Sequence, residues 1–271
     1  MKKTVLITGA SSGIGKAAAK LFREKGWNVS ATMRNPANEK ELTKIENVLC
    51  IELDVTKPDT IIKAVSETIK KFGGIDVVVN NAGYAILGPF EAASSEQIRR
   101  QFETNVIGLM EVTKAVLPHF REKRSGIIIN ISSVGGRMTF PLYSLYNSTK
   151  WCVEGFSEGL QFELAQFNVR VKIIEPGAVN TDFSGRSMDR LTTNALKDYG
   201  GFVNKIMKML DSAGRGGSSP DKVAEVIYKA ATDNKRKLRY VSGIDAKLVL
   251  TMRRILPERL FLWVIKKAVA R

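Results

Sequence analysis

Short apolar runs alternate with longer amphipathic stretches along most of this 271-residue chain, and this alternation constrains the fold more than any other feature. Strands that alternate with helices form βαβ units, whose strands lie parallel in one sheet. Most of the apolar runs are continuous in Val, Ile and Leu, as expected for strands covered on both faces. The predicted strands are Thr4 to Thr8, Asn28 to Thr32, Val48 to Glu52, Asp76 to Asn80, Gly126 to Ile131, Arg170 to Glu175 and Leu238 to Val241.

The stretches between these strands are predicted to be helices. Ser219 gives the last of them an N-cap residue, and Pro220 stands at its first helical position. With right-handed crossovers, residues 1–271 are predicted to form a single α/β domain. Its core is a doubly wound, Rossmann-type parallel sheet of the seven strands above, with helices on both faces. The predicted helices are Gly13 to Lys25, Lys57 to Phe72, Glu96 to Arg121, Tyr146 to Phe167 and Pro220 to Thr232.

Two segments depart from the alternation. Residues 182–219 are rich in Ser, Gly, Met and Lys, and a long insertion of this kind is predicted to be a substrate loop or lid, with a disordered excursion as the alternative. Residues 244–271 form a basic amphipathic C-terminal extension. This extension is interpreted either as a segment lying on a membrane surface or, as we favour, as a helix pair packed over the substrate mouth or another subunit.

The formal net charge of +15 is concentrated near the C-terminus, because eleven Lys or Arg residues and only two acidic ones follow residue 234. The chain has no nucleic-acid reading motif, so we expect at most nonspecific, salt-sensitive binding to nucleic acid. No apolar run reaches the length of a transmembrane helix, and the run after Met1 is too short for a signal peptide. Cys50 and Cys152 have neither disulfide nor metal-ligand spacing. We therefore expect a cytoplasmic protein with no metal site.

The first predicted strand leads directly into a glycine-rich turn, Thr8-Gly9-Ala10-Ser11-Ser12-Gly13-Ile14-Gly15. Glycines let the backbone approach a pyrophosphate, and a helix N-terminus directs free N–H groups and a positive dipole end at the anion. Glycines alone are weak evidence, but a strand before the turn and a helix after it are the expected context. A dinucleotide site is therefore predicted at Gly9, Ser11, Ser12, Gly13, Ile14 and Gly15.

The end of the second predicted strand bears on the choice of coenzyme. A site that prefers NAD places an acidic residue there for the ribose 2′-hydroxyl, whereas a 2′-phosphate needs positive charge. This chain has Met33 and then Arg34, and Lys16 in the glycine turn is a candidate second cation. Arginine binds phosphate through paired donors. NADP is therefore the predicted coenzyme; the alternative is that Arg34 and Lys16 are solvated surface charges.

Tyr146 and Lys150 are four residues apart in a predicted helix, so their side chains lie on one face. An ammonium about 4 Å from a phenol is worth roughly 4 kcal/mol at an effective dielectric of about 20, which would lower the tyrosine pKa toward neutrality. The phenol would then exchange a proton with an alcohol or ketone. Ser133 stands just past a predicted strand end, where its hydroxyl would bind the substrate oxygen.

These segments, in this order, resemble the NADP-preferring branch of the short-chain dehydrogenase/reductase family. The resemblance runs from the glycine turn through Asn80-Asn81-Ala82-Gly83 and the Tyr146 and Lys150 pair to Pro176-Gly177, and it is the reason for choosing Ser133 over Ser132. It implies that Asn105 holds a water in a proton relay to Lys150. It also implies that Asp54 and Val55 lie beside the adenine, that Asn81, Ala82 and Gly83 line the cofactor, and that Pro176, Gly177, Val179 and Thr181 position the nicotinamide.

The expected function is that of an NADP-dependent oxidoreductase, such as a carbonyl reductase, that interconverts an alcohol and a ketone or aldehyde. Similar tails occur in members that act on steroids, retinoids and other lipophilic carbonyls, so a bulky apolar substrate is a hypothesis. The alternatives are a 3-ketoacyl thioester reductase and a non-catalytic NADP-sensing scaffold. The resemblance also implies a homo-dimer or homo-tetramer.

Overall fold

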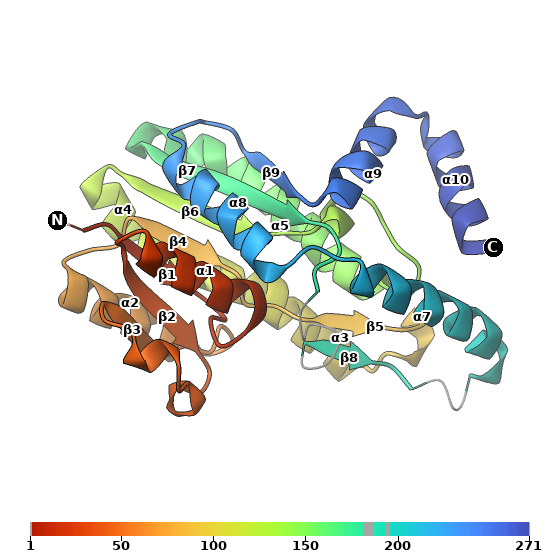
Figure 1. Ribbon diagram of the computed structural model, residues 1–271, viewed down its shortest axis with the longest axis horizontal. Helices are drawn as coiled ribbons and strands as arrows, with labels where there is room; N and C mark the ends of the chain where they lie inside the picture. The colour runs from red at the N-terminus through yellow and green to blue at the C-terminus, as the bar shows by residue number, and fades with distance from the viewer. Residues whose placement is uncertain (1, 181–186, 193–195, 271) are drawn as a thin grey trace.

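The computed structural model describes residues 2–180, 187–192 and 196–270. The main sheet has seven parallel strands in the order β3-β2-β1-β4-β6-β7-β9, which confirms the predicted doubly wound fold (Figure 1). All seven predicted strands are present, with ends that differ by no more than a residue or so. Their bounds are β1 Thr4–Ile7, β2 Asn28–Met33, β3 Val48–Glu52, β4 Val77–Asn80, β6 Gly126–Ile131, β7 Val169–Pro176 and β9 Arg239–Ser242.

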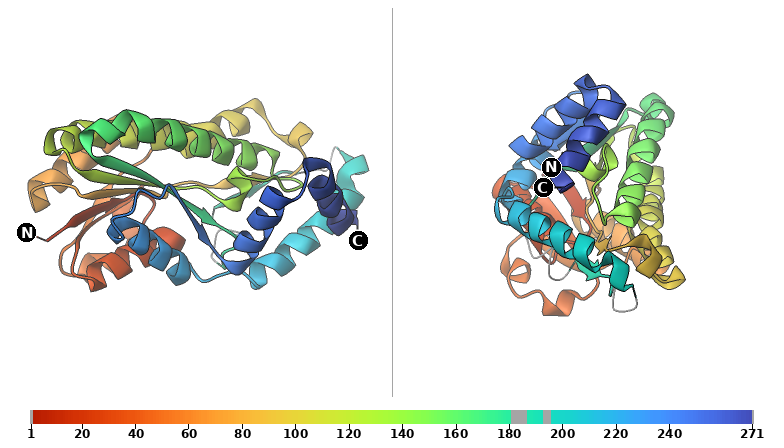
Figure 2. Two further views of the ribbon diagram at one scale, coloured as in Figure 1. Left: turned by 90° about the horizontal axis from the view of Figure 1, so that it is seen from above. Right: turned by 90° about the vertical axis from the view of Figure 1, so that its right-hand side faces the viewer.

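Helices cover both faces of this sheet (Figure 2). On one face α1 (Gly13–Glu24) packs beside α8 (Pro220–Thr232), and on the other lie α2 (Pro58–Phe72), α4 (Gly108–Lys123) and α5 (Ser144–Leu164). Strand β1 contributes to both layers because its side chains alternate. Val5 and Ile7 pack against α1 and α8, whereas Leu6 packs toward α2 and α4. A continuous apolar run is therefore what a strand in this position requires.

The long helix predicted over Glu96 to Arg121 is interrupted. Helix α3 (Ser95–Phe102) begins at a capping box formed by Ser94 and Gln97, and α4 follows it after a π-helical segment, Glu103–Ile107. A π segment inserts extra backbone into a helix and turns the following side chains. Here it places Asn105 in the protein interior, where its side chain is 1% exposed.

The region predicted to be a lid contains regular structure. Strand β8 (Met188–Arg190) pairs in parallel with β5 (Ala85–Leu87), and helix α7 (Gly200–Arg215) follows. Ile206 of α7 is fully buried and packs in one apolar cluster with Leu87 and Leu142. The described part of this region is therefore packed on the domain.

The C-terminal extension forms two helices, α9 (Ile244–Ile255) and α10 (Glu258–Ala270). They lie beside each other near the same end of the sheet as α7 (Figure 1). Arg253 of α9 joins them, because it pairs with Glu258 at 3.4 Å and lies over the Phe261 ring. Among the described residues, the structure has no helix of the length and apolarity needed to cross a lipid bilayer.

Candidate active site

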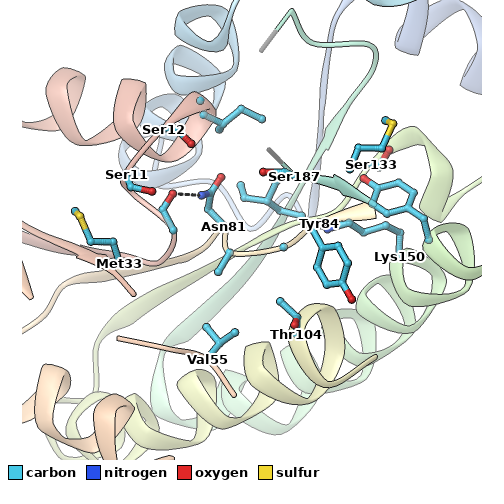
Figure 3. Close-up of a pocket in the computed structure, with 18 of the residues that line it drawn as sticks. Ser11, Ser12, Met33, Val55, Asn81, Tyr84, Thr104, Ser133, Lys150 and Ser187 are labelled. Carbon is cyan, nitrogen blue, oxygen red and sulfur yellow. Dashed lines mark hydrogen bonds between the residues drawn. The ribbon is translucent and has the colours of Figure 1, made fainter. Parts of the chain in front are cut away.

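A pocket of about 670 Å³ opens at the carboxyl ends of the parallel strands, where doubly wound sheets bind their ligands. Figure 3 shows Ser11, Ser12 and Met33 at one end of this pocket and Ser133 and Lys150 at the other, with Asn81 between them. Most of the residues predicted as site residues line it together: Gly9, Ser11, Ser12, Gly13, Ile14, Arg34, Asp54, Val55, Asn81, Ala82, Gly83, Ser133, Tyr146, Lys150, Pro176, Gly177 and Val179. Thr181 lies outside the described residues.

The glycine turn has the shape that the bound phosphates of a dinucleotide require. Gly9 and Gly13 have φ angles of +67° and +53°, which favour glycine. A Cβ atom on Gly15 would lie 2.4 Å from the carbonyl oxygen of Gly9, so only glycine fits there. Ser12 makes no side-chain capping hydrogen bond, and the first turn of α1 has no acidic residue. The first N–H groups of α1 are therefore free to bind an anion.

The segment after β4 is fastened to this turn. The Thr8 hydroxyl oxygen accepts hydrogen bonds from the backbone N–H groups of Asn81 and Ala82, both at 3.0 Å. In return, the Asn81 side-chain amide donates to the carbonyl oxygens of Thr8 and Gly9 at 2.9 and 3.1 Å. These four bonds hold two walls of the pocket together.

The two cations predicted to bind a 2′-phosphate lie in different environments. Arg34 is exposed and lines the pocket. Lys16 is not among the lining residues; its ammonium lies 3.0 Å from the Glu39 carboxylate and 2.9 Å from that of Glu41. Two carboxylates from the segment after β2 thus already balance its charge. Lys16 is therefore paired within the protein and lies outside the pocket wall, unlike Arg34.

Ser133, Tyr146 and Lys150 meet at the inner end of the pocket. Ser133 directly precedes a 3-10 turn, and its Oγ accepts a hydrogen bond from Gly135 N at 3.0 Å. Tyr146 and Lys150 lie one turn apart on α5, with the ammonium 5.6 Å from the centre of the phenol ring. The Lys150 Nζ donates to the carbonyl oxygen of Ile131 at 2.8 Å, which anchors this side chain to the end of β6.

The acid-base properties of this pair differ from the expectation that Lys150 lowers the pKa of Tyr146. Burial raises the pKa of Tyr146 to about 12, although a hydrogen bond with Ser133 works against this rise. Burial also lowers the pKa of Lys150 to about 8. Removal of both groups from water is the largest cause of these shifts, so the direction for Tyr146 is opposite to the lowering expected from the sequence.

Asn105 lies behind the pocket and not on its wall. Its side chain binds the backbone of Tyr84 on both sides, accepting from the N–H at 3.0 Å and donating to the carbonyl oxygen at 2.8 Å. It also donates to the Thr149 hydroxyl of α5 at 3.1 Å. Asn105 thus joins the segment after β4 to the helix that carries Tyr146 and Lys150.

Asp54 and Gly177 shape two of the turns that border the pocket. The Asp54 carboxylate accepts from the backbone N–H and the hydroxyl of Thr56 at 3.0 and 2.8 Å. Gly177 follows β7 and lies against Asp245. A Cβ atom on Gly177 would be 2.3 Å from the Asp245 carboxylate. That carboxylate also accepts from Ala178 N at 3.0 Å, so the start of α9 is bound to this turn.

A polar cluster at the pocket was missed by the sequence interpretation. Arg100 of α3 donates to the Tyr84 hydroxyl at 3.2 Å and forms an ion pair with Asp189 of β8. All three residues line the pocket. The position of Tyr84 directly after Asn81-Ala82-Gly83 was a usable signal, whereas nothing local marks Arg100 or Asp189, which the fold brings together over 89 residues of sequence.

Comparisons with known proteins agree with this geometry. Residues 3–191 match the family described as short chain dehydrogenase. An uncharacterized oxidoreductase of Schizosaccharomyces pombe is 45% identical over 214 residues, which cover 78% of this chain and 88% of that protein. A protein of Bacteroides thetaiotaomicron named 3-ketodihydrosphingosine reductase is 38% identical over 225 residues, covering 83% of this chain and 82% of its own.

Solved structures of similar fold include a short-chain dehydrogenase. A short-chain dehydrogenase from Streptomyces avermitilis superposes with a TM-score of 0.83 and 35% identity, over 92% of this chain and 91% of its own. The protein ElxO, solved with NADP bound, superposes with a TM-score of 0.74 and 29% identity, over 90% of this chain and 98% of its own.

Proposed function

The chain belongs to the short-chain dehydrogenase family, and from this membership we propose that it is an NADP(H)-dependent oxidoreductase that interconverts an alcohol and a ketone or aldehyde. The observation that carries the proposal is the arrangement of Ser133, Tyr146 and Lys150 in the same pocket as the glycine turn. A dinucleotide whose phosphates lie at that turn would extend along Asn81 toward these three side chains.

The roles of the three residues follow from their chemistry. A bound reduced nicotinamide supplies the hydride. The Ser133 hydroxyl would hold the substrate carbonyl oxygen, and Tyr146, protonated at neutral pH because burial raises its pKa to about 12, would give this oxygen a proton. The Lys150 ammonium would stabilise the negative charge that then forms on the phenol oxygen. Asn105, which holds Tyr84 and α5, would also hold the water of a proton relay to Lys150.

NADP is the proposed coenzyme because Arg34 lines the pocket directly after β2 and the strand ends in Met33, without a carboxylate. Among the described residues, Arg34 forms no ion pair with a protein carboxylate, so its guanidinium is available to a phosphate. The NADP bound to ElxO supports this choice.

We propose a bulky apolar substrate. Met188 lines the pocket, and the Tyr143 ring lies 5.7 Å from the Tyr146 ring. Both residues belong to the apolar cluster that Leu142 and Ile206 of α7 complete. Apolar side chains beside the proposed catalytic residues would contact the apolar part of a lipid-like ketone. Residues 182–219 would form the lid over this substrate. The similarity to a protein named 3-ketodihydrosphingosine reductase supports this class of substrate.

The test is a panel of carbonyl compounds with the purified protein, with oxidation of NADPH and of NADH followed by absorbance. The panel contains 3-ketodihydrosphingosine, a ketosteroid, a retinal, a small polar ketone and acetoacetyl thioesters. We expect turnover of a lipophilic ketone with NADPH. Turnover confined to the thioesters would support the 3-ketoacyl thioester reductase instead, and turnover confined to small polar ketones would contradict the substrate class.

Tyr146→Phe separates catalysis from coenzyme binding. This variant lacks only the phenolic hydroxyl, so we expect it to bind NADPH as the natural protein does and to lose activity by about 10²-fold to 10⁴-fold. Full biological function in Tyr146→Phe would favour the non-catalytic scaffold. The family is generally oligomeric, and sedimentation velocity on the same preparation would distinguish the proposed homo-dimer from the homo-tetramer.

A further inference from the structure

The last two helices expose apolar side chains to solvent. On α9, the side chains of Ile244, Leu248 and Ile255 are 86%, 64% and 71% exposed, and their spacing places them along one stripe of the helix. On α10, Trp263 is 56% exposed. Exposed apolar side chains that are scattered singly need no explanation, but a group of them on one helix pair marks a contact surface.

Cations surround Trp263 on the exposed side of α10. Arg259, Lys266 and Lys267 are all exposed. Arg259 precedes Trp263 by four residues, and the two lysines follow it by three and four, so all three lie on the same side of the helix as Trp263. The Lys267 ammonium lies 5.7 Å from the centre of one Trp263 ring. Phe261 is on the opposite side, where it is 2% exposed and packs within the helix pair. Helix α10 is therefore amphipathic, with a basic face that has an aromatic centre.

The acidic residues of this extension are already engaged. The Asp245 carboxylate accepts a hydrogen bond from Ala178 N, and Glu258 pairs with Arg253. Residues 244–271 contain these two acidic residues and seven Lys or Arg residues. Among the residues that the structure describes, no carboxylate therefore pairs with the cations on the exposed face of α10.

We propose that this face of α10, Arg259, Leu262, Trp263, Lys266 and Lys267, docks the protein on an anionic lipid surface. Cations that flank an amphipathic aromatic ring have the chemistry of an interfacial helix, because the ring enters the headgroup region while the ammonium and guanidinium groups bind lipid phosphates and carboxylates. A second copy of this chain fits less well, since a symmetric contact would place two sets of like charges opposite each other.

Binding of α10 to lipid does not require catalysis. The experiment is co-sedimentation of the purified 271-residue chain with vesicles of phosphatidylcholine alone and with vesicles of equal parts phosphatidylcholine and phosphatidylserine. We expect binding to the anionic vesicles only, and we expect it to weaken strongly between about 0.1 M and about 0.5 M salt because the attraction is screened. Equal binding to both kinds of vesicle, or no binding to either, overturns the proposal.

Two variants locate the contact. Replacing Arg259, Lys266 and Lys267 by Gln should lower the vesicle partition coefficient by roughly fivefold for each cation removed. The matched control replaces Lys63, Lys70 and Lys71 of α2, which are also exposed, and should bind as the natural chain does. Equal losses in both variants would mean that net charge alone acts, which contradicts a docking face.

The aromatic contribution is tested in the same way. Trp263→Ala should reduce binding, and Phe162→Ala, which removes an aromatic side chain 74% exposed on α5, should not. Thermal unfolding by circular dichroism checks that each variant is folded. If the α10 variants instead change the oligomeric state in sedimentation velocity and bind vesicles normally, the face contacts a second copy and the lipid proposal is wrong.

Discussion

Glu154 follows Lys150 by one turn of α5, and its negative charge opposes the effect of burial on the Lys150 pKa. The carboxylate is itself nearly buried, and burial together with the charge of Glu175 raises its pKa. Arg239 works against this rise from the other side, with its Nε 2.9 Å from Glu154 and 3.5 Å from Glu175. Arg137 completes this group of charges through its own pair with Glu175 at 3.1 Å.

Glu154→Gln should therefore make the Lys150 ammonium easier to deprotonate. If the ammonium is needed for turnover, the alkaline limb of the rate should move to lower pH, by roughly one pH unit. The measurement is kcat against pH in both proteins. Glu158→Gln is the matched control, because Glu158 pairs with the same Arg239 from an exposed position on the same helix. An equal shift in both variants would count against a specific effect on Lys150.

The direction of the reaction should depend on pH. Because burial raises the pKa of Tyr146 to about 12, the phenol is protonated at neutral pH and suited to donate a proton. Ketone reduction should therefore change little between about pH 6 and pH 7.5, whereas alcohol oxidation, which needs the phenolate, should rise as the pH increases toward alkaline values. Initial rates in both directions test this, and an oxidation rate independent of pH would contradict it.

Arg34→Leu should weaken NADPH binding and spare NADH binding. A charge-assisted bond to the 2′-phosphate is worth about 1.5–3 kcal/mol, which corresponds to roughly tenfold to hundredfold in Kd. Lys16→Met is the comparison variant, and its effect should be smaller because Glu39 and Glu41 already pair with Lys16. Fluorescence titration measures the Kd of NADPH and of NADH for each variant and for the natural chain. A larger loss in Lys16→Met would restore Lys16 to the phosphate site.

Asp233→Asn should destabilise the fold. Lys172 is fully buried in β7, and its ammonium lies 2.7 Å from the Asp233 carboxylate. Removing this partner leaves a buried charge with neutral acceptors only, which costs about 3–5 kcal/mol in the free energy of unfolding. Denaturant unfolding measures the change. Glu225→Gln, an exposed substitution on α8, should have almost no effect.

The same ion pair should give the fold a sensitivity to acid. Burial disfavours the charged carboxylate, but hydrogen bonds from Lys172 and Tyr240 outweigh burial and hold the pKa of Asp233 at about 2, below its ordinary value of 3.8. The stabilisation is therefore complete above about pH 4 and is lost as the pH falls from there to about 2. Asp233→Asn should lack this part of the pH dependence.

The main sheet could be predicted from the sequence because its strands are short, continuous and apolar. Helix α8 was predicted with the bounds that the structure has, since Ser219 and Pro220 mark its start. The pocket residues that follow strand ends were also predictable, because parallel strands place their carboxyl ends at one edge of the sheet.

The features that were missed depend on contacts between distant segments. Strands β5 and β8 have three residues each, too few for a periodic pattern, and they are strands because they pair with each other. The π segment before α4 leaves no compositional mark. The sequence placed Lys16 correctly on the first helix, but could not reveal that Glu39 and Glu41 fold back to pair with it.

The bonds that join Thr8 to Asn81 and Ala82 have a thermodynamic consequence. They involve protein groups alone, so the proposed cradle for the phosphates is shaped before any ligand arrives. A ligand that enters a preformed cradle does not have to immobilise it, and more of the interaction energy remains as affinity. Thr8→Val, which abolishes the acceptor, should accordingly raise the Kd of the proposed coenzyme, as measured by fluorescence titration.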